Sequence, residues 1–493
     1  MNNRDSLSIK GNKLKEILYK YYYVLLLIIL AITVFNLVFR LGVEPIKDWD
    51  EARHGVNAYE MLKNNNYILN TFNYENDYYN LKPPLSYWGI ILGFKIFGYN
   101  LIGFRAMSVF SAFLTIIIVA VFSYKRFGRI ASLVSAGVMA TSIHFLQFHG
   151  ARSGDADSIY VLLFTISIIA AINSYYKKNY IYVTGLAFSL AFLAKSWHTM
   201  AIVAIVGLYL IITKLILKFN WRQWLIFIGC SFGPILVWAL IRIRYDGFKF
   251  IHDMISYDLL SRTNSPIEGH TGPWYDYILD LVVYYRWYIA VFILLLFILI
   301  ISRNIRYAIK DNLNEYIGLI IWVVLPLILF SIAKTKLAWY IFPIYPPLAL
   351  LIGCMAEYSI QSFRKSVYPI ILCLIIASTA GLYEYKLLNY IRTEPIDVFE
   401  NYLRDSNISL DKYTSYVYRP TQVEGTDWNQ RNVFALELFK DGKAKSGGIK
   451  EFLNTDKYSI LFLDNNDASL KLIKENNLKI VDSNSSIISA AKQ

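Results

Sequence analysis

Apolar residues in this chain occur in repeated blocks, each roughly 17–22 residues long, and this feature constrains the fold more than any other. A block of that length crosses the hydrocarbon core of a bilayer as an α-helix. The 493 residues are 56% hydrophobic and only 17% charged, which leaves too little polar surface for a soluble protein. We therefore predict a mainly α-helical, polytopic transmembrane bundle.

Hydropathy predicts about eleven spans. They lie at approximately residues 21–40, 104–123, 130–147, 157–175, 180–196, 198–217, 223–241, 286–302, 316–333, 338–357 and 368–386. The first has no small-residue cleavage site after it, so we expect it to be retained. The segment 85–98 is short and interrupted by Gly89, Gly93 and Lys95.

Basic loops predict the orientation. If the N-terminus is cytoplasmic and 85–98 does not cross, every short basic loop lies inside, as the positive-inside rule requires. These loops carry Lys125, Arg126, Arg129, Lys177, Lys178, Lys214, Lys218, Arg222, Arg303, Arg306, Lys310, Arg364 and Lys365, and the N-terminus carries Lys10, Lys13 and Lys15. Segment 85–98 is then expected to be a helix in the outer interface.

This topology places residues 41–103, 148–156, 242–285 and 334–337 outside a multi-pass protein of the plasma membrane. Cytoplasmic loops facing anionic lipid account for the net charge of +13, so we expect membrane lipids and no nucleic acid as partners. The three cysteines fall in apolar runs, which indicates buried thiols and no disulfide framework.

The composition changes near residue 387, where Asp, Asn, Lys and Ser replace the apolar blocks. We predict a transmembrane domain over 1–386, with long outer loops at 41–103 and 242–285, and a C-terminal domain over 387–493. An odd number of spans places this second domain outside. A buried strand at 458–463 followed by a helix at 468–476 is typical of a small α/β domain.

The first outer loop begins with two adjacent acids, Asp50 and Glu51, just before an amphipathic helical pattern. Acids at this point are common as helix caps, because they suit the positive end of the helix dipole. A carboxylate at the membrane surface is also suited to accept a proton from an attacking hydroxyl. Farther along the loop, Lys82 precedes Pro83-Pro84, where its ammonium either reaches the lipid headgroups or binds a phosphate.

The second outer loop carries Arg152, Asp155 and Asp157. Asp157 precedes a span and is therefore a candidate N-cap. The spaced pair of Asp155 and Asp157 also suits a divalent cation, although two carboxylates are a weak signal for a metal.

The remaining outer loops supply Arg262, His270, Lys334, Lys336 and Tyr340. An arginine offers bidentate recognition of a phosphate. Two lysines on the outside run against the positive-inside bias and indicate an anionic ligand. Acids, a histidine and cations all at the outer lipid–water boundary suit an amphiphile with a phosphate head and a lipid tail.

In order and spacing, these motifs resemble the polyprenyl-phosphate-dependent glycosyltransferases of the GT-C fold, over about residues 20–360. The nearest patterns are glycosyltransferase family 39, the protein O-mannosyltransferases, and the bacterial aminoarabinose transferase of lipid A. The resemblance is carried by Asp50-Glu51 with Glu60-Met61-Leu62, Lys82-Pro83-Pro84-Leu85, Gly154-Asp155-Ala156-Asp157 and Lys334-Thr335-Lys336-Leu337 with Tyr340.

The resemblance implies transfer of a sugar from a polyprenyl-phosphate donor to a hydroxyl on the outer face, with inversion. Asp50 is implied as the base, with Glu51 and Asp157 positioning it or the donor. Lys82, Arg262 and Lys336 are implied to bind the donor phosphate, and Asp155, Arg152, His270, Lys334 and Tyr340 are substrate-binding candidates. No cofactor is required, while a divalent cation at Asp155 and Asp157 is left open.

Two departures from the family pattern leave the sugar and the acceptor unassigned. Leu81 stands where the lipid A enzymes carry an acid, and His54-Gly55 stands where Tyr-Ala is typical. A lipid, a protein and a wall polymer all remain candidate acceptors. The alternatives are a transporter or lipid-sugar flippase, whose ionisable residues usually lie at mid-membrane, and a structural or sensory protein.

Overall fold

The computed structural model describes residues 13–266, 269–302, 310, 312–363, 367–419, 429–445, 447–455 and 458–492. Its contacts divide the chain into two compact units. The helical unit comprises the chain up to Phe39, Ser108–Arg152 and Ala156–Tyr390, and the α/β unit comprises Arg40–Met107, Ser153–Asp155 and the chain from Ile391 onward. The topology residues Lys10, Arg303, Arg306, Arg364 and Lys365 lie outside the described ranges.

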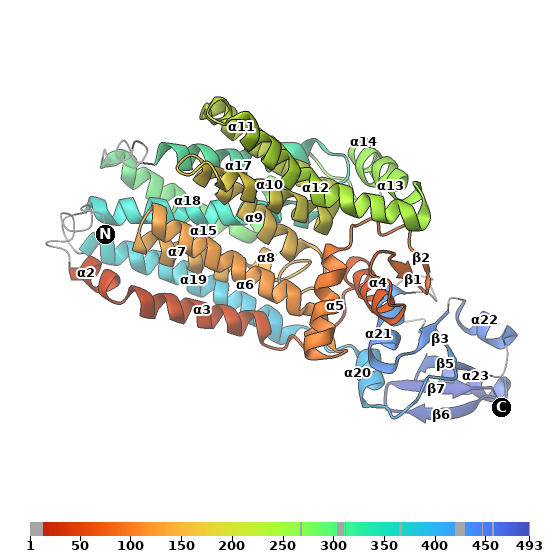
Figure 1. The fold of residues 1–493 in the computed structure, drawn as a ribbon. Helices are drawn as coiled ribbons and strands as arrows, with labels where there is room; N and C mark the ends of the chain where they lie inside the picture. Colours follow the sequence, from red (N-terminus) through yellow and green to blue (C-terminus); the bar gives the residue numbers. More distant parts are fainter. Residues whose placement is uncertain are drawn as a thin grey trace. The chain divides into compact units, whose positions relative to one another are not determined.

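The described part of the helical unit consists of helices (Figure 1). Two of them, α6 and α19, extend past the boundaries of the unit. The first set is α2 (Lys13–Lys20), α3 (Tyr22–Val38), α6 (Leu101–Arg126), α7 (Arg129–Ala140), α8 (Ile143–Leu146), α9 (Asp157–Ser174), α10 (Tyr180–Lys195), η1 (Ser196–Thr199) and α11 (Met200–Ile212). The second set is η2 (Leu215–Leu217), α12 (Trp221–Asp246), α13 (Lys249–Asp253), η3 (Met254–Ser261), α14 (Arg262–Asn264), α15 (Asp276–Ile301), α17 (Leu313–Ile332), η4 (Ala338–Ile344), α18 (Tyr345–Ser362) and α19 (Val367–Thr393).

Within the described ranges, eight helices are long and apolar enough to cross a membrane, or nine if the bent pair α2–α3 forms one span. Two changes reduce the eleven expected spans to these nine. The segment expected at 130–147 is the 12-residue helix α7 followed by the short α8. The segments expected at 180–196 and 198–217 form one candidate, Tyr180–Ile212, interrupted only by η1.

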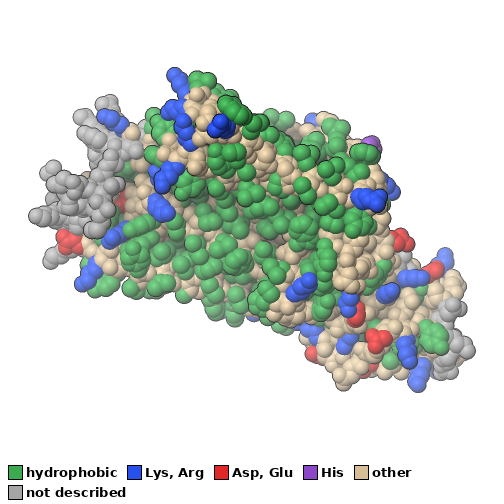
Figure 2. All heavy atoms as spheres, in the orientation of Figure 1, with side chains coloured by type: hydrophobic (Ala, Val, Ile, Leu, Met, Phe, Trp, Pro, Cys, Tyr) green, Lys and Arg blue, Asp and Glu red, His purple; other side chains and the backbone are tan. Residues whose placement is uncertain are grey.

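Apolar side chains cover the outside of these helices, as Figure 2 shows. Along α12, for example, Leu225, Phe232, Leu236 and Leu240 are each about half exposed or more. An apolar surface this extensive suits lipid and not water. The prediction of a polytopic helical membrane protein is confirmed.

The α/β unit contains a two-stranded and a five-stranded sheet. Its elements are α4 (Asp50–Lys63), β1 (Thr71–Phe72), β2 (Glu75–Asn76), α5 (Leu85–Phe97), α20 (Val398–Asp405), β3 (Thr414–Tyr418), α21 (Gln430–Lys440), β4 (Lys443–Ala444), α22 (Gly448–Asn454), β5 (Ser459–Asp464), α23 (Asp467–Glu475), β6 (Lys479–Ser483) and β7 (Ile487–Ala491). The strand order is β4-β3-β5-β7-β6, parallel across β4-β3-β5 and antiparallel across β5-β7-β6.

The strand predicted at 458–463 and the helix predicted at 468–476 are observed as β5 and α23. β5 is apolar because it is the central strand, with β3 on one side and β7 on the other. One hydrophobic core joins this sheet to the first loop of the chain, since buried side chains of α4, α5, α20 and α21 belong to the same cluster as Ile460 and Phe462. Helix α5 has 13 residues and a length of about 20 Å, less than the roughly 30 Å of a hydrocarbon core.

Candidate active site

Asp50 is the first residue of α4, and its side chain is 39% exposed. The N-cap position belongs to Trp49, whose side chain makes no capping hydrogen bond, so neither acid of the pair acts as the N-cap. The ammonium of Lys82 lies 3.9 Å from Asp50 Oδ1. The predicted base and one predicted phosphate ligand are therefore neighbours in the α/β unit.

Glu51 is fully buried and bound through both oxygens. Arg105 donates to Oε1 from Nε at 2.8 Å and to Oε2 at 3.2 Å, while the backbone N–H groups of Lys47 and Gly154 donate at 2.7 and 2.8 Å. Burial alone would raise the pKa of Glu51, but the Arg105 charge and these hydrogen bonds outweigh it and lower the pKa. Glu51 is thus an ionised anchor for the start of α4 and for the loop that carries Asp155.

His54 lies one turn after Asp50 on α4 and is buried. Its Nδ1 is 3.0 Å from the Asp50 carbonyl and 3.7 Å from Asp155 Oδ1, while Nε2 has no hydrogen-bond partner among the described residues. Burial, followed by the Lys82 charge, lowers the pKa of His54 to about 4, so the imidazole is neutral at pH 7. The contact to the carbonyl assigns the proton to Nδ1.

A polar network fixes the loop that holds Lys82. Arg53 pairs with Asp77 through two hydrogen bonds of 2.8 Å, and Asp77 also accepts from Asn57 at 3.0 Å. Asn80 donates to Asn57 at 2.8 Å and accepts from Lys82 at 3.3 Å. The Lys82 ammonium is therefore oriented by α4 and by the residues just before Lys82 in the sequence.

In the helical unit, Asp157 forms a buried ion pair with Lys195. Asp157 is the first residue of α9, whose N-cap is Ala156, so the predicted capping role does not apply. Lys195 ends α10, and its ammonium lies 5.7 Å from the ring centres of Tyr160 and Tyr340. A positively charged partner already compensates this carboxylate.

Arg262 and Tyr340 lie together in the helical unit. The Arg262 guanidinium is 3.0 Å from Asp258 and 3.5 Å from the Tyr340 hydroxyl. The backbone N–H of Lys336 donates to the carbonyl of His270 at 3.1 Å, so two of the predicted outer loops meet here. By contrast, Arg152 is buried and donates to the backbone carbonyls of Asn36 and Leu37 at 2.7 and 3.1 Å.

A pocket of about 570 Å³ opens beside these loops, within the helical unit. One part of its lining is apolar, with Trp274, Leu327 and Ile332, and another part is the two lysines Lys334 and Lys336. Apolar walls next to two ammonium groups suit a ligand with a hydrocarbon tail and an anionic head. The volume falls in the usual range for small-molecule sites.

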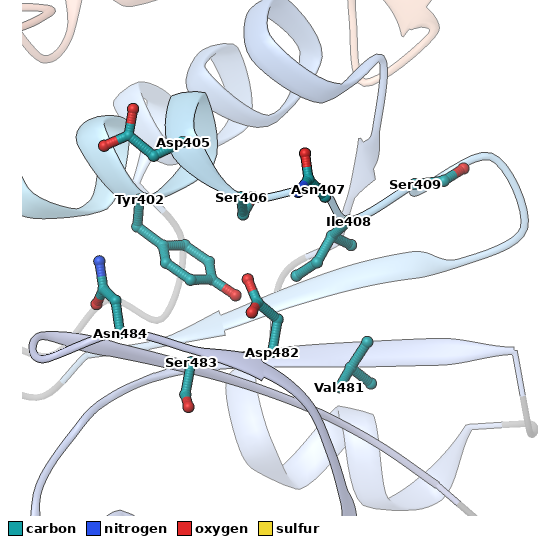
Figure 3. Close-up of a pocket in the computed structure, with 10 residues that line it drawn as sticks. All are labelled: Tyr402, Asp405, Ser406, Asn407, Ile408, Ser409, Val481, Asp482, Ser483 and Asn484. Carbon is teal, nitrogen blue, oxygen red and sulfur yellow. The ribbon is translucent and has the colours of Figure 1, made fainter.

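A second pocket, of about 460 Å³, lies on the five-stranded sheet (Figure 3). It is lined by the C-terminal half of α20, by the residues that follow α20 and by the end of β6, and the Tyr402 hydroxyl points toward Asp482. None of the predicted site residues lines it.

Sequence reasoning missed Arg105, His54 and the network around Asp77. Arg105 had a visible signal, because an arginine within an apolar span requires a partner or a function. The role of His54 had none, because its burial depends on chain segments far away in sequence. Lys195 is a charge within an apolar run of the sequence, but nothing in the sequence pairs it with Asp157.

Comparisons with known proteins agree with this fold. Residues 81–238 match the family described as dolichyl-phosphate-mannose-protein mannosyltransferase. A protein of Aquifex aeolicus is 26% identical over 338 residues, which is 68% of this chain and 74% of that protein. The undecaprenyl phosphate-alpha-4-amino-4-deoxy-L-arabinose arabinosyl transferase of Pseudomonas savastanoi pv. phaseolicola is 26% identical over 313 residues, 62% of this chain and 56% of that enzyme.

Among solved structures, ArnT from Cupriavidus metallidurans bound to undecaprenyl phosphate superposes with a TM-score of 0.65 at 14% identity, covering 94% of this chain and 97% of that one. The predicted GT-C fold with a small C-terminal sheet domain is confirmed. The chain spans about half the length of the curated arabinosyl transferase that it matches. Together, the comparisons support a membrane glycosyltransferase of the GT-C type.

Proposed function

We propose that this protein transfers a sugar from a polyprenyl-phosphate donor to a hydroxyl acceptor on the outer face of the plasma membrane, with inversion. Residues 1–386 carry the transfer in this proposal, and residues 387–493 form the outer C-terminal domain. The observation that carries the proposal is the pairing of two adjacent acids in opposite environments. Asp50 is half exposed beside an ammonium, and Glu51 is buried and bound on both oxygens.

The donor side of the proposal rests on the lysine-lined pocket. A polyprenyl chain is apolar, which matches the lining by Trp274 and Leu327. Its phosphate is anionic, which matches the ammonium groups of Lys334 and Lys336. Arg262 and Tyr340 add a guanidinium and a hydroxyl in the same unit. These groups would stabilise the negative charge that grows on the phosphate as it leaves. The family resemblance implies Lys82 as a further phosphate ligand.

Asp50 acts as the general base in this mechanism. The acceptor oxygen attacks the anomeric carbon, the bond from that carbon to the phosphate oxygen breaks, and the bonding electrons leave with the phosphate. The acceptor proton passes to the Asp50 carboxylate. A single displacement of this kind inverts the anomeric carbon.

Glu51 supports inversion because its carboxylate is not available to attack the sugar. Retention through a covalent intermediate needs a second carboxylate close enough to attack the sugar. Both oxygens of Glu51 already accept hydrogen bonds from Arg105 and from backbone N–H groups. We assign to Glu51 and Asp157 the role of positioning Asp50 or the donor. Asp155, Arg152 and His270 stay candidates for binding the substrate, each through the loop that carries it.

The test separates donor binding from transfer in the full-length protein purified in detergent. Undecaprenyl phosphate serves as the binding probe, and the lipid-linked sugar that accumulates when the protein is removed from its cell serves as the donor. Asp50→Asn should bind undecaprenyl phosphate with unchanged affinity and lose transfer by about 10²–10⁴-fold, the usual contribution of a general base.

Asp48→Asn is the matched control, because it makes the same change two residues away and keeps the oxygen that accepts from Trp49. It should transfer at the wild-type rate. Wild-type transfer by Asp50→Asn would remove Asp50 from the mechanism. Movement of the lipid-linked sugar across a vesicle bilayer without transfer would favour the flippase alternative.

A further inference from the structure

Helix α21 of the C-terminal segment contacts α4 along one stripe. The backbone N–H of Arg431 donates to Asp48 at 3.2 Å, just before α4 begins. Toward the other end, Asp441 accepts from the Tyr59 hydroxyl and from the Lys63 ammonium. Contacts at both ends mean that the C-terminal segment holds the whole helix that begins with Asp50.

Gly55 and Phe434 make the closest approach in this stripe. A Cβ on Gly55 would lie 2.4 Å from the Phe434 ring, a distance that no real Cβ tolerates. Gly55 is also a position where this chain departs from the family pattern. The missing side chain therefore makes room for an aromatic ring of the C-terminal segment.

Glu60 and Glu437 contact each other through their side chains farther along the same stripe. Both are buried, with exposed fractions of 0% and 2%. Glu60 Oε1 accepts from the Tyr74 N–H at 2.9 Å. The Oε2 atoms of both glutamates and the Thr71 hydroxyl make no hydrogen bond of normal geometry among the described residues. Thr71 and the backbone of Asn73 nevertheless lie close enough to Glu60 to favour its charged form, whereas no such group in the described part of the chain acts on Glu437. Two ionised carboxylates cannot donate to each other, so a contact between them requires one shared proton or one cation.

The charged groups around the pair do not supply that positive charge. Lys63 is bound to Asp441, itself an acid one turn after Glu437. Lys443 lies over the Tyr74 ring, 4.6 Å from its centre. The phenols of Tyr59 and Tyr74 are neutral, because burial raises the pKa of each. The remaining charges near the pair are therefore acidic or already compensated.

We infer that Glu60 and Glu437 share a single proton, and that Glu437 is a positioning residue that holds α4, and hence Asp50, against the C-terminal domain. One carboxyl group then donates a hydrogen bond to the other, so both Oε2 atoms have a partner. A proton, unlike a bound ion, needs no cavity between the two side chains. The consequence for transfer rests on the proposed function. The shared proton does not depend on the proposed function, and a separate measurement tests it.

The sign of the pH effect follows from the direction of the pKa shifts. Burial raises the pKa of Glu60, and burial together with the Glu60 charge raises the pKa of Glu437. The folded state therefore binds one proton more than the unfolded state above the ordinary carboxyl pKa of about 4.3. From this pair, the unfolding equilibrium constant increases about tenfold per pH unit until the folded-state pKa is reached.

The experiment measures thermal unfolding of the full chain in detergent from pH 5 to pH 9. Glu437→Gln keeps a donor and cannot ionise, so its Tm should fall less with pH than that of the wild type, by about 2 °C or more at pH 9. Glu475→Gln, an exposed carboxyl of the same domain, should follow the wild-type curve. In the transfer assay, Glu437→Gln should keep its kcat at pH values where the wild type loses activity.

Identical pH dependence of the wild type and Glu437→Gln would overturn the shared proton. So would a Tm of the wild type that rises with CaCl2 or MgCl2 while that of Glu437→Gln does not, because the pair would then hold a cation. If the Tm curves separate as expected and no transfer occurs at any pH, the proton pair stands and the proposed function fails.

Discussion

At the scale of single residues, the pair Glu51–Arg105 is the most consequential contact of the site. Both side chains are fully buried, and Arg105 also donates to the backbone carbonyls of Leu41, Glu44 and Pro45. One arginine therefore fixes the chain before α4, and through Glu51 it fixes α4 itself. A buried pair is costly to break from one side, because the remaining charge stays buried without compensation.

We expect Arg105→Leu to lower the free energy of unfolding by about 3–5 kcal/mol. Because the folded-state pKa of Glu51 is lowered, the contribution of the pair is complete above the unfolded pKa of about 4.3 and is lost as the pH falls from there through the folded-state pKa. Denaturant unfolding at pH 7 and at a series of pH values below 4 checks both points. Lys471→Ala, which breaks an exposed pair with Glu475, should cost about 0–1 kcal/mol; an equal cost for the two variants would contradict the expectation.

Lys336→Met tests the donor pocket at the same scale. Loss of one charged hydrogen-bond donor, about 1.5–3 kcal/mol, should weaken undecaprenyl phosphate binding roughly 10- to 100-fold. Titration of the purified protein with undecaprenyl phosphate measures this change. Lys177→Met removes an exposed lysine outside the pocket and should leave the affinity unchanged; equal losses in both variants would indicate unspecific attraction.

At the scale of elements, α4 joins the catalytic candidates to the C-terminal sheet. Its N-terminal end carries Asp50, its middle packs on Phe434, and its C-terminal end binds Asp441. Because one helix carries both Asp50 and the contacts to the C-terminal segment, the packing at its middle affects the position of Asp50. A small change in side-chain volume at the middle of α4 should therefore change the stability of the protein.

Gly55→Ala should destabilise the protein by about 1–3 kcal/mol, because the new methyl group overlaps the Phe434 ring. Alanine is otherwise the better helix former by about 1 kcal/mol. Gly137→Ala on α7, where a Cβ meets nothing within 4 Å, should be neutral or stabilising. Thermal unfolding of both variants separates the two cases, and similar Tm shifts would argue against tight packing at Gly55.

At the scale of the whole molecule, the orientation in the membrane remains a prediction. Lys177 lies in a loop expected inside, and Lys471 lies on α23 of the domain expected outside. Single cysteines at these positions, with Cys230, Cys354 and Cys373 replaced by alanine, should react with a membrane-impermeant maleimide from opposite sides. Labelling of both from one side would contradict the prediction that this loop and the C-terminal domain lie on opposite sides of the membrane.

The sequence by itself determined the membrane class, most of the spans, the C-terminal α/β domain and the order of the motifs. Hydropathy and motif spacing are local properties of the sequence. In a bilayer an apolar run of sufficient length forms a helix, because the backbone finds no water to bind, so these local patterns predict the structure. The length of α5 and the strand β5 were predictable for the same reason. The sequence also identified Asp50 and Lys82, which lie 3.9 Å apart.

Only the tertiary structure decided the environment of each acid. Glu51 and Asp50 are neighbours in sequence, yet Glu51 is neutralised by Arg105, 54 residues away, and Asp50 is not buried. Likewise, Glu60 meets Glu437 only because the C-terminal segment packs on α4. Burial and charge partners set the protonation of a carboxylate, and both depend on contacts between segments far apart in the chain.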